Sequence, residues 1–140
     1  MSYDLRKAPA KCVPLNEELD PITLFADKID DLITLVIDKH PADGIILNYH
    51  MKIETAKKHD PSIIIKKAGP AIFNEREIII KGVDALPSID TSRIEEADFR
   101  YIVTLLRSDW ESLDRSKKSE IHNKIKDLLK IYIMYIKQLK

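Results

Sequence analysis

The most informative pattern lies at the C-terminal end of the chain, where apolar residues recur at the spacing of a helix. The first stripe consists of Ile121, Ile125, Leu128, Tyr132, Ile136 and Leu139. This period predicts a helix over residues 114–140 with Asp114 as its N-cap. A second apolar set shares the same turns, namely Leu129, Ile131, Ile133, Met134 and Tyr135. Because a surface helix needs only one stripe, the surplus predicts either deep burial in the domain or contact with a partner.

Five further helices follow from the same kind of pattern. Asp20-Pro21 and Asp60-Pro61 are helix-start signals, since Asp accepts hydrogen bonds from the free N–H groups of the first turn and Pro needs no partner there. Gly69 and Pro70 predict that one short helix ends and the next begins. The six expected helices span residues 21–39, 43–59, 61–68, 70–81, 95–113 and 114–140.

The identical tetrapeptides Ile63–Lys66 and Ile78–Lys81 leave an alternative open. Three consecutive β-branched residues suit a buried strand of a hairpin, because they lose side-chain freedom in a helix. The nearby prolines, Pro61 and Pro70, favour helix starts over a sheet interior. We therefore predict helices in this middle third of the chain.

Two segments lack any sustained period. Residues 1–19 contain Pro9 and Pro14 and predict an extended N-terminal arm. Residues 83–96 contain Pro87, Ser88, Asp90, Thr91 and Ser92 and predict an exposed loop. A chain of 140 residues supports one hydrophobic core. The expected fold is therefore a single all-α domain of about six helices over residues 20–140, preceded by the arm.

Charge and cysteine content exclude several classes of protein. The 23 basic and 23 acidic residues give a net charge of zero, which disfavours a protein that holds duplex DNA through phosphate contacts. The single cysteine, Cys12, cannot form an internal disulfide. The charged N-terminal residues are not a secretory signal, and no apolar run has the length of a membrane span. We expect a soluble intracellular protein, cytoplasmic or nuclear, or a component of a particle assembled there.

Catalytic and metal-binding chemistry has little support in the sequence. No two histidines lie three or four residues apart, so no helical face presents a histidine pair to a metal. The four histidines are His40, His50, His59 and His122, and they are expected at the surface or at helix caps. The acidic residues of the first helix, Asp27, Asp30, Asp31 and Asp38, suggest a solvated face. We predict no catalytic residue, no metal and no cofactor.

Protein contacts are the better-supported expectation. Trp110 lies on the apolar side of its helix and is expected to be a core anchor. The apolar surplus near the C-terminus and the basic residues of the arm are expected to meet a partner or a second copy. The predicted partner-binding residues are Ile131, Met134 and Tyr135 in the last helix and Arg6, Lys7 and Lys11 in the arm.

A series of short motifs adds a resemblance to these patterns. In chain order they are Pro41, Tyr49, Asp60-Pro61, Ile64, Pro70, Arg76-Glu77-Ile78 and Trp110-x-x-Leu113-Asp114-x-x-Lys117. Over residues 29–139 this order resembles a group of small all-helical proteins encoded by large nucleocytoplasmic DNA viruses. The chain departs from that group after Ile80, where Lys81–Asp84 stands in place of an aromatic and acidic cluster. The resemblance implies a virion or assembly component rather than a catalyst.

These observations predict a non-enzymatic structural or assembly protein that acts through protein contacts, such as a minor capsid or other virion component. The alternative is a helical nucleic-acid-associated or transcription-regulatory factor. It would use the basic pairs Lys57-Lys58 and Lys66-Lys67. Salt-dependent DNA binding would favour this alternative.

Overall fold

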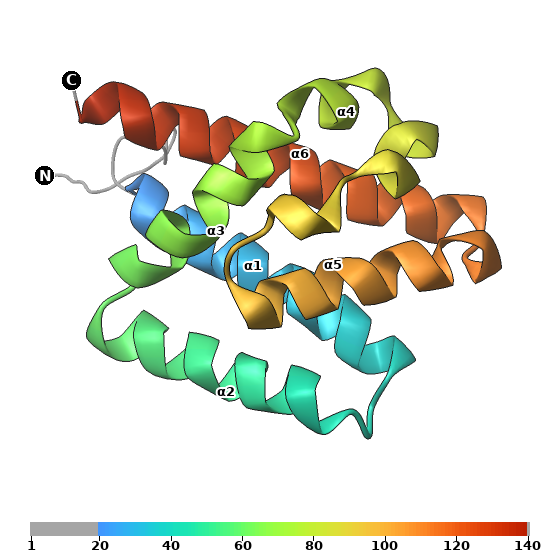
Figure 1. Ribbon diagram of the computed structural model, residues 1–140. Coiled ribbons are helices and arrows are strands. Elements are labelled where there is room, and N and C mark those ends of the chain that lie inside the picture. The colour runs from blue at the N-terminus through green and yellow to red at the C-terminus, as the bar shows by residue number, and fades with distance from the viewer. Residues whose placement is uncertain (1–19, 140) are drawn as a thin grey trace, which may run out of the picture.

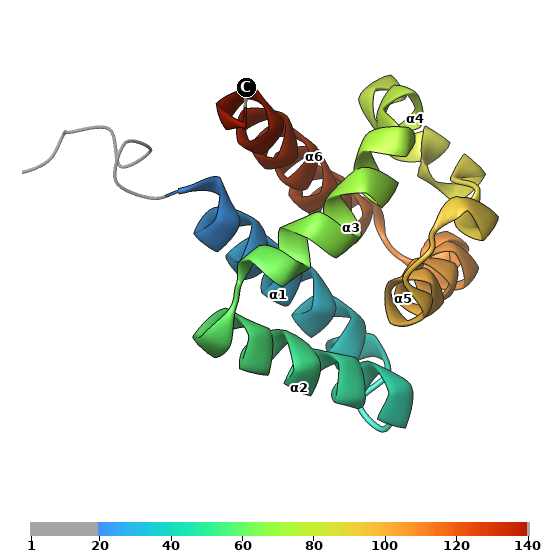
Figure 2. The same cartoon turned by 60° about the vertical axis from the view of Figure 1, so that its left-hand side comes forward.

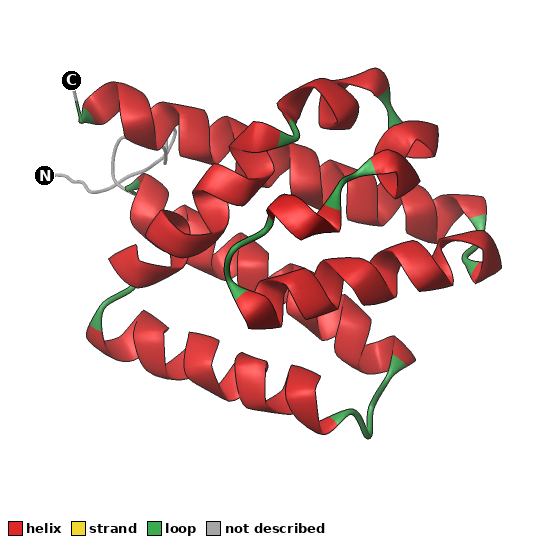
Figure 3. Ribbon diagram, in the orientation of Figure 1, coloured by secondary structure: helices red, strands yellow, loops and turns green. Residues whose placement is uncertain are grey.

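The computed structural model describes residues 20–139, and every regular element in that range is helical (Figure 3). The six α-helices are α1 (Pro21–Lys39), α2 (Gly44–His59), α3 (Ser62–Asn74), α4 (Arg76–Lys81), α5 (Ala97–Asp109) and α6 (Arg115–Gln138). Three short 3-10 helices are η2 (Val83–Ser88), η3 (Thr91–Arg93) and η4 (Trp110–Ser112). The all-α prediction is confirmed, and the strand alternative for Ile63–Lys66 and Ile78–Lys81 is excluded.

α1 is the central helix of the fold. Asp20 caps it by accepting a hydrogen bond from the Thr23 N–H at 2.8 Å, and Pro21 occupies its first position, as the sequence predicts. Its buried residues are Pro21, Phe25, Ala26, Ile29, Leu32, Ile33 and Val36. α2, α3, α5 and α6 all pack against it (Figures 1 and 2). The packing of four helices against α1 explains why its apolar face is broad.

α2 runs antiparallel to α1 along one edge of the molecule (Figure 2). Its N-cap Asp43 accepts hydrogen bonds from the Ile45 and Ile46 N–H groups. The buried stripe is narrow and contains Ile46, Tyr49 and Ile53. Much of the α2 surface therefore faces solvent.

The helix break predicted at Gly69-Pro70 is wrong. α3 continues through both residues to Asn74, and the chain turns at Glu75 instead. Pro70 costs the helix one backbone hydrogen bond, but Ile64, Ile65, Ala68 and Ile72 are buried along the same helix and offset that loss. Gly69 lies against Tyr132 of α6, where a Cβ would overlap the aromatic ring. Packing against α6 thus decides the course of α3.

The exposed loop predicted at residues 83–96 is also wrong. This segment forms η2 and η3 and buries three apolar side chains, Leu86, Ile89 and Ile94. The Glu75 carboxylate holds the segment, because it accepts hydrogen bonds from the Asp90 N–H at 3.3 Å and from the Arg93 guanidinium at 3.2 Å. The segment is a cover over the core rather than a free loop.

α6 packs against α1 and also contacts α3 and α4 (Figure 1). Asp114 caps it as predicted, accepting a hydrogen bond from the Lys117 N–H at 2.8 Å. Trp110, just before it, is buried as predicted. Among residues 20–139, no helix is long and apolar enough to span a membrane.

Candidate functional site

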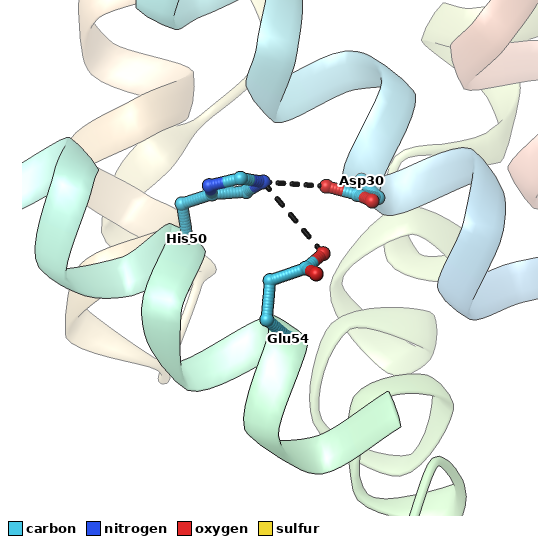
Figure 4. A group of neighbouring side chains, drawn as sticks. All are labelled: Asp30, His50 and Glu54. Carbon is cyan, nitrogen blue, oxygen red and sulfur yellow. Dashed lines mark hydrogen bonds and ion pairs between the residues drawn. The ribbon is translucent and has the colours of Figure 1, made fainter. Parts of the chain in front are cut away.

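A polar cluster joins α1 to α2 (Figure 4). α1 contributes Asp27 and Asp30, and α2 contributes His50, Glu54 and Lys57 at helical spacing on one face. His50 Nε2 lies 2.7 Å from Asp30 Oδ1 and 3.8 Å from Glu54 Oε1. Lys57 Nζ lies 3.1 Å from Asp30 Oδ2 and 3.2 Å from Asp27 Oδ1. We call these five residues the interhelix cluster.

Asp30 is the centre of the interhelix cluster, because each of its two oxygens has a nitrogen partner. Burial raises the pKa of Asp30, but hydrogen bonds from Lys57 and His50 outweigh burial, so that the pKa lies below its usual value. Burial lowers the pKa of Lys57, and its contacts with Asp30 and Asp27 reverse this and raise it. Ion pairs that remain in contact with solvent, as these partly buried ones do, contribute on the order of 1 kcal/mol each. The cluster therefore orients α2 on α1 more than it stabilises the fold.

The interhelix cluster differs from what the sequence predicts for these residues. Asp30 is partly buried rather than part of a fully solvated face. One imidazole nitrogen and two carboxylate oxygens, from His50, Asp30 and Glu54, lie within 4.8 Å of one another. The four-residue spacing of His50 and Glu54 is a signal in the sequence, but a search for histidine pairs misses it. Asp30 has no such signal, because its approach depends on how α1 and α2 pair.

The other three histidines have separate environments. His40 Nε2 contacts Asp109 Oδ2 at 2.6 Å, which joins the end of α1 to α5. His122 is buried, and its Nε2 lies 2.9 Å from the Ile79 carbonyl oxygen, so the expected surface or cap position is wrong for it. His59 is exposed.

An open apolar groove lies between α2 and α3. Its volume is about 490 Å³, and it is lined by Asn48, Met51, Lys52, Thr55, Ala56, His59, Asp60 and Ile63. Met51 is 67% exposed and Ile63 41%. Leu47, one turn before Met51 on the same face of α2, is 39% exposed. We call this surface, with Leu47, the α2–α3 groove.

The surroundings of the α2–α3 groove are basic, although the whole chain is neutral. α3 contains no acidic residue, and α2 contains one, Glu54, which belongs to the interhelix cluster. Asp60 lies between the two helices. The exposed lysines on these helices are Lys52, Lys58, Lys66 and Lys67. Of these lysines, Lys52 lines the groove and pairs with Asp98 at 2.9 Å, and Lys58 is adjacent to the lining residue His59.

The C-terminal residues predicted to bind a partner separate into two groups. Ile131 and Tyr135 are 8% and 9% exposed and belong to the core of this chain, so neither is available to a partner in this fold. Their burial follows from the contacts of α6 with α1 and α3. Met134 is 36% exposed and stays a predicted contact residue. Arg6, Lys7 and Lys11 lie outside the described residues.

A small apolar cavity lies where α1, α3, α4, α5, α6 and η2 meet. Its volume is about 50 Å³, and its walls include Leu32, Phe99, Trp110 and Leu128. A cavity that admits benzene measures about 150 Å³. This space is therefore an ordinary packing void rather than a ligand site.

We compared the chain with protein family models, curated proteins and solved structures, and none of the three comparisons gives a match. None of them links the chain to proteins of large DNA viruses, so the resemblance described above stays a prediction.

Proposed function

We propose that this protein is a non-enzymatic binding or assembly protein whose partner docks in the α2–α3 groove. The observation that carries the proposal is the exposure of Met51 and Ile63, which line the groove, together with that of Leu47, one helical turn before Met51. Large apolar side chains gathered on one face are typical of interaction surfaces. A catalytic arrangement has no comparable support among residues 20–139.

The occupant that fits this surface best is an amphipathic helix of a partner protein with acidic flanks. The groove follows the axis of α2, and helix-in-groove recognition uses apolar anchors at helical spacing. Leu47 and Met51, four residues apart, offer the complementary spacing. Lys52, which lines the groove, and Lys58, next to the lining residue His59, favour acidic side chains on either side of those anchors.

The narrower role, as a minor capsid or other virion component, is supported by the resemblance to viral helical proteins alone. In that role the partner helix belongs to another component of the particle. An intracellular location is supported by the lone Cys12. The nucleic-acid alternative is weaker, because Glu95 and Glu96 line the same surface hollow as Lys66 and Lys67.

The proposal is tested with two model peptides. Both form helices with leucine at the three- and four-residue spacing, one with glutamate and the other with lysine at the remaining charged positions. The acidic peptide should bind and the basic peptide should not, as measured by isothermal titration calorimetry. Met51→Glu and Ile63→Glu should each weaken binding by at least about tenfold, as expected for central apolar anchors.

The matched control is Ile80→Glu on α4. Ile80 is 71% exposed, at least as much as Met51, but lies outside the groove. This variant should bind the acidic peptide like wild type. Equal binding of both peptides, no binding of either, or an equal loss in Ile80→Glu would contradict the proposal. Salt-dependent binding of duplex DNA that Lys66→Glu removes would favour the nucleic-acid factor instead.

A further inference from the structure

The interhelix cluster presents three metal-ligating atoms to one another from two regular helices. His50, Asp30 and Glu54 each offer one ligand atom, and the three atoms lie within 4.8 Å of one another. Figure 4 shows the imidazole edge facing both carboxylates. Ligands on facing helices are held more rigidly than ligands on loops. Metal sites in helical bundles are built in the same way, from side chains of neighbouring helices.

The two distances that join His50 to the carboxylates are close to those between ligand atoms of a coordinated ion. A tetrahedral Zn²⁺ with ligands at about 2.0–2.1 Å separates its ligand atoms by roughly 3.3 Å. The distance from His50 Nε2 is 2.7 Å to Asp30 Oδ1 and 3.8 Å to Glu54 Oε1. The first distance must lengthen and the second must shorten by about half an ångström to match. Side-chain rotations of partly exposed residues suffice for such shifts.

Lys57 does not occupy the oxygen of Asp30 that would bind the ion. Its ammonium contacts Asp30 Oδ2, whereas the oxygen that faces His50 is Oδ1. Ligating carboxylates are commonly fixed by a second hydrogen bond of this kind. Lys57 thus fixes Asp30 through Oδ2 and leaves Oδ1 to bind the ion. Asp27 in turn pairs with the Lys57 ammonium.

The formal charges of the interhelix cluster also match a divalent cation. Asp27, Asp30 and Glu54 are acidic, and Lys57 is basic, so a neutral His50 leaves two negative charges in excess. A protonated His50 compensates one of them. A divalent cation bound to neutral His50 compensates both.

We propose that Asp30, His50 and Glu54 bind a divalent transition-metal ion, with Zn²⁺ as the best fit, and that Lys57 positions Asp30 for it. The imidazole ligand favours Zn²⁺ over Mg²⁺ or Ca²⁺, which take oxygen ligands. The bound ion links α1 to α2 and so fixes the helix that carries most of the α2–α3 groove. The site is separate from the groove and does not depend on the proposed function.

The test titrates ZnCl₂ into the metal-free full-length chain by isothermal titration calorimetry. A Cys12→Ser background removes the one thiol that could bind zinc. We expect one ion per chain, and a visible spectrum of the Co²⁺-loaded protein typical of tetrahedral coordination. Lys57→Met should weaken zinc binding by about 10–100-fold, the range for groups that orient a ligand. His50→Ala and Glu54→Gln should weaken it at least as much.

Two histidine variants serve as controls. His59 is exposed on the same helix, and His40 belongs to the other histidine–aspartate pair. His59→Ala and His40→Ala should bind zinc like wild type, and circular dichroism should show that all variants remain helical. The proposal is overturned if the chain binds no zinc stoichiometrically. It is equally overturned if folded His50→Ala binds zinc as tightly as wild type.

Discussion

α6 and α2 both carry apolar residues beyond one stripe, but these additional residues are mostly buried on α6 and exposed on α2. α6 contacts α1, α3 and α4, and those neighbours bury Ile131 and Tyr135. α2 lies at the edge of the molecule, and Leu47 and Met51 stay exposed on it. The α6 pattern is the more conspicuous in the sequence, although the open surface is on α2. An apolar surplus therefore identifies an interaction surface only when the neighbours of the helix are known.

The largest expected effect contrasts a core leucine of α6 with a surface leucine of α2. Leu128 is fully buried, so Leu128→Ala should lower the free energy of unfolding by about 2–5 kcal/mol. Leu47→Ala, at an exposed position, should change it by no more than about 0.5 kcal/mol. Urea denaturation followed by circular dichroism measures both. Equal losses of unfolding free energy in the two variants would contradict the difference in burial between the two helices.

Tyr135 and Met134 provide the second test, because the sequence pattern groups them and the structure separates them. Tyr135→Ala removes most of a buried ring and should lower the free energy of unfolding by about 2–4 kcal/mol. Met134→Ser should lower it by less than about 1 kcal/mol. If Tyr135→Ala weakens self-association while stability stays at the wild-type value, then Tyr135 belongs to an interface after all.

A smaller effect is expected where α2 meets α5. The Tyr101 hydroxyl donates a hydrogen bond to Asp43 Oδ2 at 2.6 Å. This hydrogen bond lowers the pKa of Asp43 and raises the pKa of Tyr101. A lowered pKa in the folded state gives stability that is present above about pH 4 and lost as the pH falls through the folded value. A raised tyrosine pKa gives stability that is present below about pH 10 and is lost as the pH rises through the pKa of the folded state.

Tyr101→Phe removes this hydrogen bond and leaves the ring in place. Its melting temperature should fall below that of wild type by the largest amount near pH 7. The difference should narrow below pH 4 and again above pH 10. A difference that stays constant from pH 3 to pH 11 would show that the pair does not link α2 to α5 in the way described.

Capping residues are the part of the fold that the sequence predicts best. Asp20 and Asp114 cap α1 and α6 as expected, and α2 begins within two residues of its expected start, where Asp43 caps it. The prediction for Asp60 is wrong, because Pro61 stands at the N-cap position of α3 and no side chain caps that helix. These signals are local, because an aspartate side chain and the next backbone N–H groups form the cap without help from the rest of the chain. Helix ends that depend on distant packing, such as the passage of α3 through Pro70, escape prediction for the same reason.

The repeated tetrapeptide shows the limit of local reasoning most clearly. In Ile63–Lys66 the last two isoleucines are buried and the first is exposed. In Ile78–Lys81 only Ile79 is fully buried, and Ile80 is the most exposed large apolar residue among those described. Identical sequences thus face the core differently, because α3 and α4 approach it from different directions. The interhelix cluster and the α2–α3 groove arise from the same kind of long-range packing.

The central claim is that partner binding occurs in the α2–α3 groove rather than on α6. Amide chemical shifts of the ¹⁵N-labelled chain, recorded during titration with the acidic model peptide, test it most directly. We predict that the largest shifts fall on residues 47–63 and that the amides of residues 131–138 stay unchanged. If the largest shifts fall around Met134 on α6 and the groove residues do not respond, the claim is wrong.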